Sequence, residues 1–243
     1  MVEGLGCYRT SPTQPINQSC TSNLNSRWLI VGLVAFLFAV DFDKFFKPLL
    51  PVSHLSIVAQ VALFIFIEDF AYYWWHRAQH HFRFLWVFHA VHHSQERLTF
   101  ATNGRFHPIE RLMFEPVIII LMMILGFNVA TPLIVAVFFI LLSEFQHTQI
   151  PWRYGPFYRI FVSPVYHLYH HGKTAEYKDK NFAHIFAFWD YLFGTAVARN
   201  TPPPSSYGLV EMNPRSFVET LTAPFRLLYE DARTSWFRPG VPK

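Results

Sequence analysis

Three short segments hold most of the histidines of this chain, and their spacing constrains the fold more than any other feature. Residues three or four positions apart lie on one face of a helix, so each segment is expected to direct its imidazoles at one spot. Neutral imidazole is the commonest metal ligand in proteins. The segments are His76-x-x-x-His80, His89-x-x-His92-His93 and His167-x-x-His170-His171.

The number of imidazoles points to two metal ions. Thirteen histidines occur in 243 residues, and eight of them fall in these three segments. One tetrahedral zinc ion takes about four ligands, so eight or more converging imidazoles exceed the needs of a single ion. The alternative is that surface histidines cluster by chance or satisfy a polar core. Three separate segments with the same spacing disfavour that alternative.

The composition is typical of a membrane protein. Hydrophobic residues make up 52% of the chain and charged residues only 15%, well under the roughly 25% of soluble domains. The net charge of +4 is mild, and no basic patch interleaved with aromatics indicates nucleic-acid binding. Cys7 and Cys20 provide neither a disulfide scaffold nor an iron–sulfur site. Histidine is therefore the expected ligand.

The apolar runs predict an all-α, integral membrane bundle of about four transmembrane helices. Runs occur at 28–40, at 55–70 and at 116–143, and Gly126-Phe127-Asn128 divides the last of these into a helical hairpin. A hairpin returns His147 to the side that holds the histidine segments. That side also carries the arginines, so the bias of positive charge places it in the cytoplasm. We expect a multi-pass protein with a cytosolic, histidine-rich helical cap.

The chain divides into three regions. Residues 1–26 are polar and are expected to form a flexible tail without a cleaved signal peptide. Residues 27–200 form the predicted membrane domain. Residues 201–243 form a C-terminal tail, with an amphipathic helix expected near 216–229.

Further histidines and acids are candidates for the site. His147 is expected to join the ligands, because it returns to the same membrane face. His184 and His107 stay open: each either ligates metal, contacts substrate or, for His107 in particular, supports the site as scaffold. The resulting ligand set is His76, His80, His89, His92, His93, His147, His167, His170 and His171.

Three carboxylates are candidates for accepting the second N–H of a ligating imidazole, which would fix its tautomer. Asp69 lies seven residues before His76, two helical turns away on the same face. Glu96 and Glu144 lie within three residues of His93 and His147. The alternative for all three is a solvated or capping charge.

These segments, in this order and around a hydrophobic hairpin, resemble the fatty acid hydroxylase/sterol desaturase superfamily of membrane di-iron enzymes. The resemblance covers roughly residues 50–196. Supporting pieces are Asp69-Phe-Ala-Tyr-Tyr-Trp, Arg105-Phe-His-Pro-Ile-Glu110, Gln146-His147-Thr148, and Asp179-Lys-Asn-Phe through Trp189-Asp-Tyr-Leu-Phe-Gly-Thr195. His147-Thr148 and the third histidine segment are similar to the alkylglycerol monooxygenase branch.

The resemblance implies two iron ions at the histidine site, O2 as co-substrate, and hydroxylation or desaturation of a C–H bond in a sterol, fatty acyl or ether lipid. Electrons would come from a separate protein or reductant of unknown identity. A membrane metal-binding or transport protein is the main alternative, and a bis-histidine haem protein is another. Transporters place their ligands near the bilayer midplane, whereas these segments lie outside the apolar runs.

Overall fold

The computed structural model describes residues 48–50, 52–99, 102, 104–128 and 130–236. Within these residues the chain is helical and contains no strand, only an isolated bridge between Gly172 and Tyr207. The all-α prediction is therefore confirmed. The elements are η3 (Val52–His54), α2 (Ile57–His81), α3 (Arg83–His93), α4 (Pro108–Leu125), α5 (Ala130–Gln146), η5 (Gly155–Arg159), α6 (Pro164–His170), α7 (Phe188–Leu192) and α8 (Phe217–Trp236).

Helix α2 carries the first histidine segment out of an apolar stretch. The Ser56 side chain caps its first turn by accepting a hydrogen bond from the Ala59 amide. The helix ends where Phe82 turns into extended backbone. Its 25 residues span roughly 37 Å, more than the roughly 30 Å of a bilayer core. His76 and His80 therefore lie in the last turns, beyond the most apolar part.

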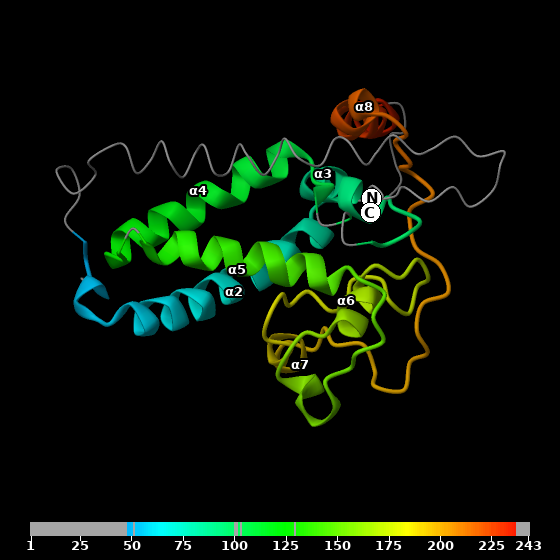
Figure 1. Cartoon of the computed structure of the whole chain (residues 1–243). Helices are drawn as coiled ribbons and strands as arrows, with labels where there is room; N and C mark the ends of the chain where they lie inside the picture. The colour runs from blue at the N-terminus through cyan, green and yellow to red at the C-terminus, as the bar shows by residue number, and fades with distance from the viewer. Residues whose placement is uncertain (1–47, 51, 100–101, 103, 129, 237–243) are drawn as a thin grey trace, which may run out of the picture.

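The predicted hairpin is present as α4 and α5. Gly126 ends α4 in the left-handed conformation, with φ of 66°. A Cβ at this position would lie 2.7 Å from the Pro48 side chain, so only glycine fits the turn. The two helices run antiparallel to each other beside α2 (Figure 1).

Four membrane crossings are not confirmed. Among the described helices, α2 alone is long and apolar enough to cross a membrane by length and composition. Helix α5 is apolar but has 17 residues, and α4 carries Glu110, Arg111 and Glu115 near its start. The run at 28–40 and the expected tail at 1–26 lie outside the described residues.

One apolar core joins α2, α4 and α5. Phe64 of α2 packs with Phe114 and Ile118 of α4 and with Val135 and Phe139 of α5. This core holds the helices as a bundle that extends to one side of the molecule, while α3, α6, α7 and α8 gather at the other end (Figure 1). We call that end the cap.

The C-terminal segment packs onto the cap. Met212, Ala223 and Leu227 share a core with Val87 and Val91 of α3. On the surface, the Arg83 guanidinium donates to the carboxylates of Glu211 and Asp231 at 3.0 and 2.8 Å. The predicted amphipathic helix is confirmed as α8, and it begins and ends later than the predicted range.

Candidate metal centre

Nine histidines form two adjacent clusters in the cap. Within each cluster, one nitrogen of every ring lies within 4.8 Å of the others. The five-histidine cluster contains His76, His80, His89, His93 and His170. The four-histidine cluster contains His92, His147, His167 and His171. The structure thus brings together all nine residues that the sequence predicts as ligands.

The second and third histidine segments are each divided between the clusters, which corrects the expectation that every segment points at one spot, whereas His76 and His80 of the first segment stay together. His89 and His93 enter the five-histidine cluster, whereas His92 enters the four-histidine cluster. His170 likewise separates from its neighbour His171. Successive helical residues are turned by roughly 100°, so a single turn of α3 or α6 serves both clusters. Only pairs four residues apart stay together.

The Nε2 atoms within each cluster lie at the spacing of ligands around one ion. Two nitrogens at right angles, on bonds of about 2.1 Å, would be roughly 3.0 Å apart, and a tetrahedron would separate them by roughly 3.4 Å. The separations fit right-angled coordination. They are 3.1 Å for His76–His89, 3.1 Å for His89–His93, 3.0 Å for His93–His170, 3.1 Å for His92–His147, 3.0 Å for His147–His167 and 3.1 Å for His167–His171.

Hydrogen bonds at the Nδ1 atoms, on the side of each ring away from the cluster, leave the lone pairs of the Nε2 atoms facing one another. His76 Nδ1 donates to the Phe182 carbonyl at 2.8 Å, and a carbonyl only accepts, so the neutral ring has no proton on Nε2. His89 Nδ1 lies 2.9 Å from the Glu110 carboxylate and carries its proton there for the same reason. Two unprotonated Nε2 atoms 3.1 Å apart repel each other unless a cation lies between them. This arrangement fits a bound metal ion.

Three other imidazoles are oriented by a similar contact at Nδ1. His170 Nδ1 donates to the Lys180 carbonyl at 2.8 Å, and His147 Nδ1 donates to the Ser143 carbonyl at 2.6 Å. His80 Nδ1 lies 3.2 Å from Asp179 Oδ1, and its Nε2 is buried without a hydrogen-bond partner. Each bond turns Nε2 toward the cluster and fixes the tautomer.

Burial favours the neutral form of five imidazoles in the cap. Removal from water, reinforced by the charge repulsion between neighbouring rings, holds the pKa of five of them well below the usual 6.5. Neutral rings are the form that binds metal. The five are His92, His93, His167, His170 and His171.

Two buried carboxylates, Asp190 and Asp69, anchor the segment 182–189 beside the site. Asp190 accepts hydrogen bonds from the amides of Phe182 and Ala183 at 2.8 and 2.9 Å, and from the hydroxyls of Tyr166 and Thr195 at 3.0 and 2.7 Å. The chain segment fixed in this way contains the Phe182 carbonyl that holds His76. Asp190 thus positions a ligand from a distance.

Asp69 does not contact an imidazole, which corrects the role predicted for it. Its Oδ1 accepts from the Ile185 amide at 2.7 Å, and its Oδ2 accepts from the Phe186 amide and Trp189 Nε1, both at 3.0 Å. These three donors lie on the far segment 185–189, so Asp69 ties that segment to α2.

The other candidate acids are placed differently. Glu96 is exposed and accepts from Asn213 Nδ2 at 3.3 Å, so it is a loop charge that joins the C-terminal segment. Glu144 is half-buried on α5, one turn before His147, and its predicted role stays a prediction. Sequence reasoning missed Glu110 and Asp179 as partners of His89 and His80. Glu110 is 21 residues from His89, and Asp179 is 99 residues from His80. A pattern of local spacing therefore cannot reveal either pair.

The two open histidines lie outside both clusters. His107 caps α4: its Nδ1 accepts from the Ile109 amide at 3.2 Å, and its Nε2 donates to the Leu221 carbonyl at 3.1 Å. Both nitrogens are therefore used by the scaffold. The His184 ring lies between Tyr72 of α2 and Phe139 of α5, with centroid distances of 4.9 and 4.8 Å.

Two clusters of imidazoles at metal-ligand spacing, gathered at one end of a helical bundle, define a histidine-rich metalloprotein. The chain belongs to the fatty acid hydroxylase family, whose model matches residues 61–195. The matched range contains all nine clustered histidines. The family resemblance, including the alkylglycerol monooxygenase branch, is confirmed.

Characterised relatives share much of this chain. It is 33% identical over 189 residues to the ornithine lipid hydroxylase OlsE of Rhizobium tropici, covering 77% of this chain and 55% of that protein. It is 31% identical over 179 residues to the alkylglycerol monooxygenase of Homo sapiens, covering 71% and 37%. A very-long-chain aldehyde decarbonylase of Oryza sativa subsp. indica, GL1-11, is 28% identical over 195 residues, covering 77% and 72%.

The chain spans only about half or less of the first two relatives. No solved structure matches it.

Proposed function

We propose that this protein is an O2-dependent, non-haem di-iron oxidoreductase that hydroxylates or desaturates a C–H bond of a lipid. The observation that carries the proposal is the pair of histidine clusters, in which nitrogen lone pairs converge at metal-ligand spacing. Two relatives named as a lipid hydroxylase and a monooxygenase support the reaction class.

The donor set fits iron. Imidazole is a ligand that iron accepts, and right-angled spacing favours an ion with more than four positions over tetrahedral zinc. Iron bound here would supply the activation of O2. The protein holds the ions, fixes the tautomers from Glu110, Asp179 and three backbone carbonyls, and surrounds the site with buried rings that exclude water.

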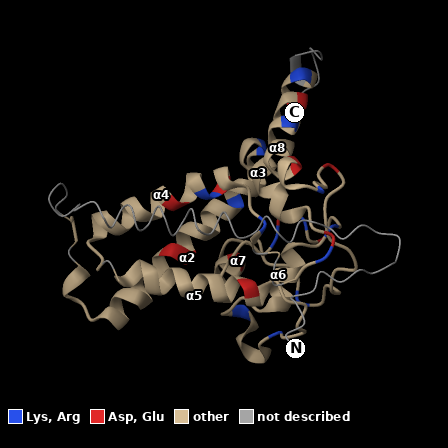
Figure 2. Ribbon diagram, turned by 45° about the horizontal axis from the view of Figure 1, so that its top comes forward, with Lys and Arg blue, Asp and Glu red and all other residues tan. Residues whose placement is uncertain are grey.

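A multi-pass membrane location accounts for the surface of the bundle. Large apolar side chains on α2, α4 and α5 are exposed, which is unusual for a soluble monomer. They include Val58 at 74%, Val117 at 56% and Leu141 at 65%. Figure 2 shows few charges on the ends of these helices that lie far from the cap. We propose that these ends lie in lipid, with the cap on the cytoplasmic face.

An apolar substrate would then reach the site along the bundle. The His184 ring lies between Tyr72 of α2 and Phe139 of α5. Its backbone carbonyl accepts a hydrogen bond at 2.6 Å from Gln146, the residue before His147. We propose that His184 contacts the lipid chain near the point of oxidation. Electrons would come from a separate donor.

The test uses the full chain purified with iron. We expect about two iron ions per chain, as the two sets of imidazole ligands require, no Soret band, and consumption of O2 only with both lipid and a reductant. Lipid extracts from cells with and without the protein would identify the oxidised product. Two bound ions without any product or O2 uptake would instead favour the metal-binding or transport alternative.

A further inference from the structure

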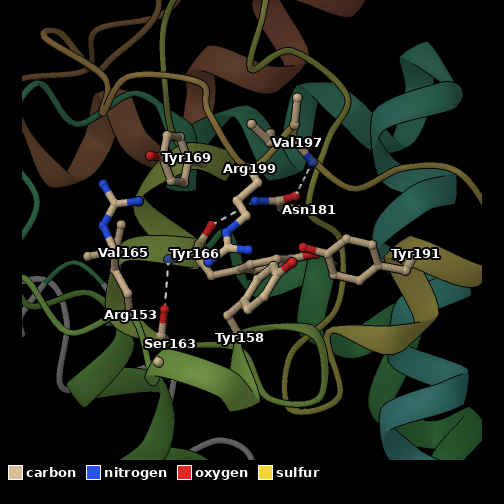
Figure 3. A pocket seen from close by; sticks show the side chains of 12 residues that line it. Arg153, Tyr158, Ser163, Val165, Tyr166, Tyr169, Asn181, Tyr191, Val197 and Arg199 are labelled. Carbon is tan, nitrogen blue, oxygen red and sulfur yellow. Dashed lines mark hydrogen bonds between the residues drawn. The ribbon is translucent and has the colours of Figure 1, made fainter.

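A second site lies on the other face of α6 from the histidines. His167 and His170 of α6 enter the metal clusters, whereas Val165, Tyr166 and Tyr169 of the same helix line a cavity of about 200 Å3. Figure 3 shows this cavity, which Arg153 and Arg199 also line. The proposed oxidation does not require it.

The cavity is positively charged. Within the part of the chain that the structure describes, neither Arg153 nor Arg199 forms an ion pair with a carboxylate. Their guanidinium groups instead lie near aromatic faces, 5.9 Å from Tyr169 and 4.7 Å from Tyr158. The neighbouring Arg159 lies 5.4 Å from the Tyr158 ring and adds a third positive charge. An anion would relieve this accumulation of like charges.

Hydroxyl groups stand beside the arginines. The Tyr158 hydroxyl accepts a hydrogen bond from Arg159 Nε at 2.7 Å, which leaves its own proton to donate. The Tyr191 ring lies 6.2 Å away, and its hydroxyl has no hydrogen bond to another described residue. The Asp190 carboxylate, which accepts a hydrogen bond from the lining residue Tyr166, is already satisfied by four donors. The polar groups that remain available to a ligand in this cavity are therefore hydrogen-bond donors.

The size and the donors together favour a phosphate group. Sites for whole small molecules have volumes of roughly 300–1,000 Å3, so a cavity of about 200 Å3 admits a head group and excludes acyl chains. The planar fork of arginine matches the oxygen geometry of phosphate, and it donates two hydrogen bonds at once.

The rim of the cavity identifies the source of that phosphate. The connection between α5 and α6 exposes large apolar side chains close to its arginines: Trp152 at 58%, Phe157 at 56% and Ile160 at 43%. Tryptophan and basic residues in alternation are typical of the membrane interface. A phosphate reaching Arg153 from this side would belong to a lipid.

We propose that the Arg153–Arg199 cavity binds the phosphate of a membrane phospholipid, while Trp152 and Phe157 enter the lipid around it. The connection runs from His147 to His167, one ligand of the four-histidine cluster at each end. A phospholipid bound here would hold that part of the cap against the bilayer. The proposal depends on the cavity and not on the oxidation chemistry.

The test measures binding to the iron-loaded full chain in an uncharged detergent. The probes are dioctanoyl phosphatidylglycerol, dioctanoylglycerol without phosphate, and inorganic phosphate. We expect saturable binding of the phosphatidylglycerol and roughly tenfold weaker binding after Arg199→Gln, the effect of losing one charge-assisted contact. Arg233→Gln, which removes an exposed arginine from the end of α8, is the matched control and should change nothing.

A double variant, Trp152→Ser with Phe157→Ser, separates the sources of phosphate. It should weaken binding of the phosphatidylglycerol and leave that of inorganic phosphate unchanged. Equal affinity for dioctanoylglycerol, or an unchanged affinity after Arg199→Gln in a variant that retains its iron and melting temperature, would overturn the proposal. Inorganic phosphate binding as tightly as the lipid would overturn the assignment to phospholipid.

Discussion

The two histidine clusters are built from the same residue type but are supported differently. In the five-histidine cluster, four rings are held from behind, two of them by the carboxylates of Glu110 and Asp179. In the four-histidine cluster, the structure gives such a bond for His147 alone. The Nδ1 atoms of the other three rings, His92, His167 and His171, are buried without a hydrogen-bond partner.

The difference teaches how a ring can be oriented without a hydrogen bond. His92 stacks on Phe106 with a centroid distance of 4.3 Å and an interplanar angle of 9°. Packing therefore fixes this ring, whereas hydrogen bonds fix four of the five rings of the other cluster. Carboxylates also raise the basicity of the imidazoles they contact. We expect the five-histidine cluster to hold its ion more tightly.

The largest expected effect comes from removing one ligand of each cluster. His170→Ala and His171→Ala change neighbouring residues that serve different ions. We expect both to abolish activity, and His171→Ala to lose more iron, because it leaves three imidazoles where His170→Ala leaves four. Iron content and O2 uptake measure this. His81→Ala is the control, since His81 is exposed beside His80. Equal iron loss in both variants would contradict the ranking.

Replacing Glu110 should weaken one cluster alone. Glu110→Gln removes the charge behind His89 but keeps an oxygen that can accept its hydrogen bond. We expect roughly 10–100-fold weaker metal binding at the five-histidine cluster, measured by competition with a chelator. Glu115→Gln, on the same helix and paired with Arg111 at 3.3 Å, should have no such effect. If the Glu110→Gln variant lost metal from the four-histidine cluster first, Glu110 would not support the five-histidine cluster alone.

Asp190→Asn should act through the loop. An amide cannot accept from all four donors of Asp190, so the segment that holds His76 loosens. We expect a loss of stability of roughly 1–3 kcal/mol, seen as a lower melting temperature, together with faster iron release from the five-histidine cluster. A lower melting temperature with unchanged release would assign Asp190 to folding only.

The smallest effect is expected at Asp179. Its side chain is 51% exposed and lies 3.2 Å from His80, so water weakens the interaction. Asp179→Asn should change metal affinity by no more than a few-fold, measured with the same chelator assay. An effect as large as that of Glu110→Gln would show that burial does not set the strength of these contacts.

Much of the site could be predicted from the sequence, because helical spacing is a local property. The nine histidines, the hairpin with its break at Gly126, and helix α8 all follow from short patterns. The assignment of His92 and His93 to different clusters does not, since it depends on where α3 lies relative to α6. The partners Glu110 and Asp190 are joined to the site by long-range contacts, and Asp69 binds a segment more than 100 residues away.

The division of neighbouring histidines between the clusters has a consequence for how this protein can vary. Inserting or deleting one residue within 89–93 would rotate the remaining imidazoles by about a quarter turn and disturb both ions together, whereas a point substitution damages one. In this helix, evolution or design is therefore less free to change the number of residues than to change their identity.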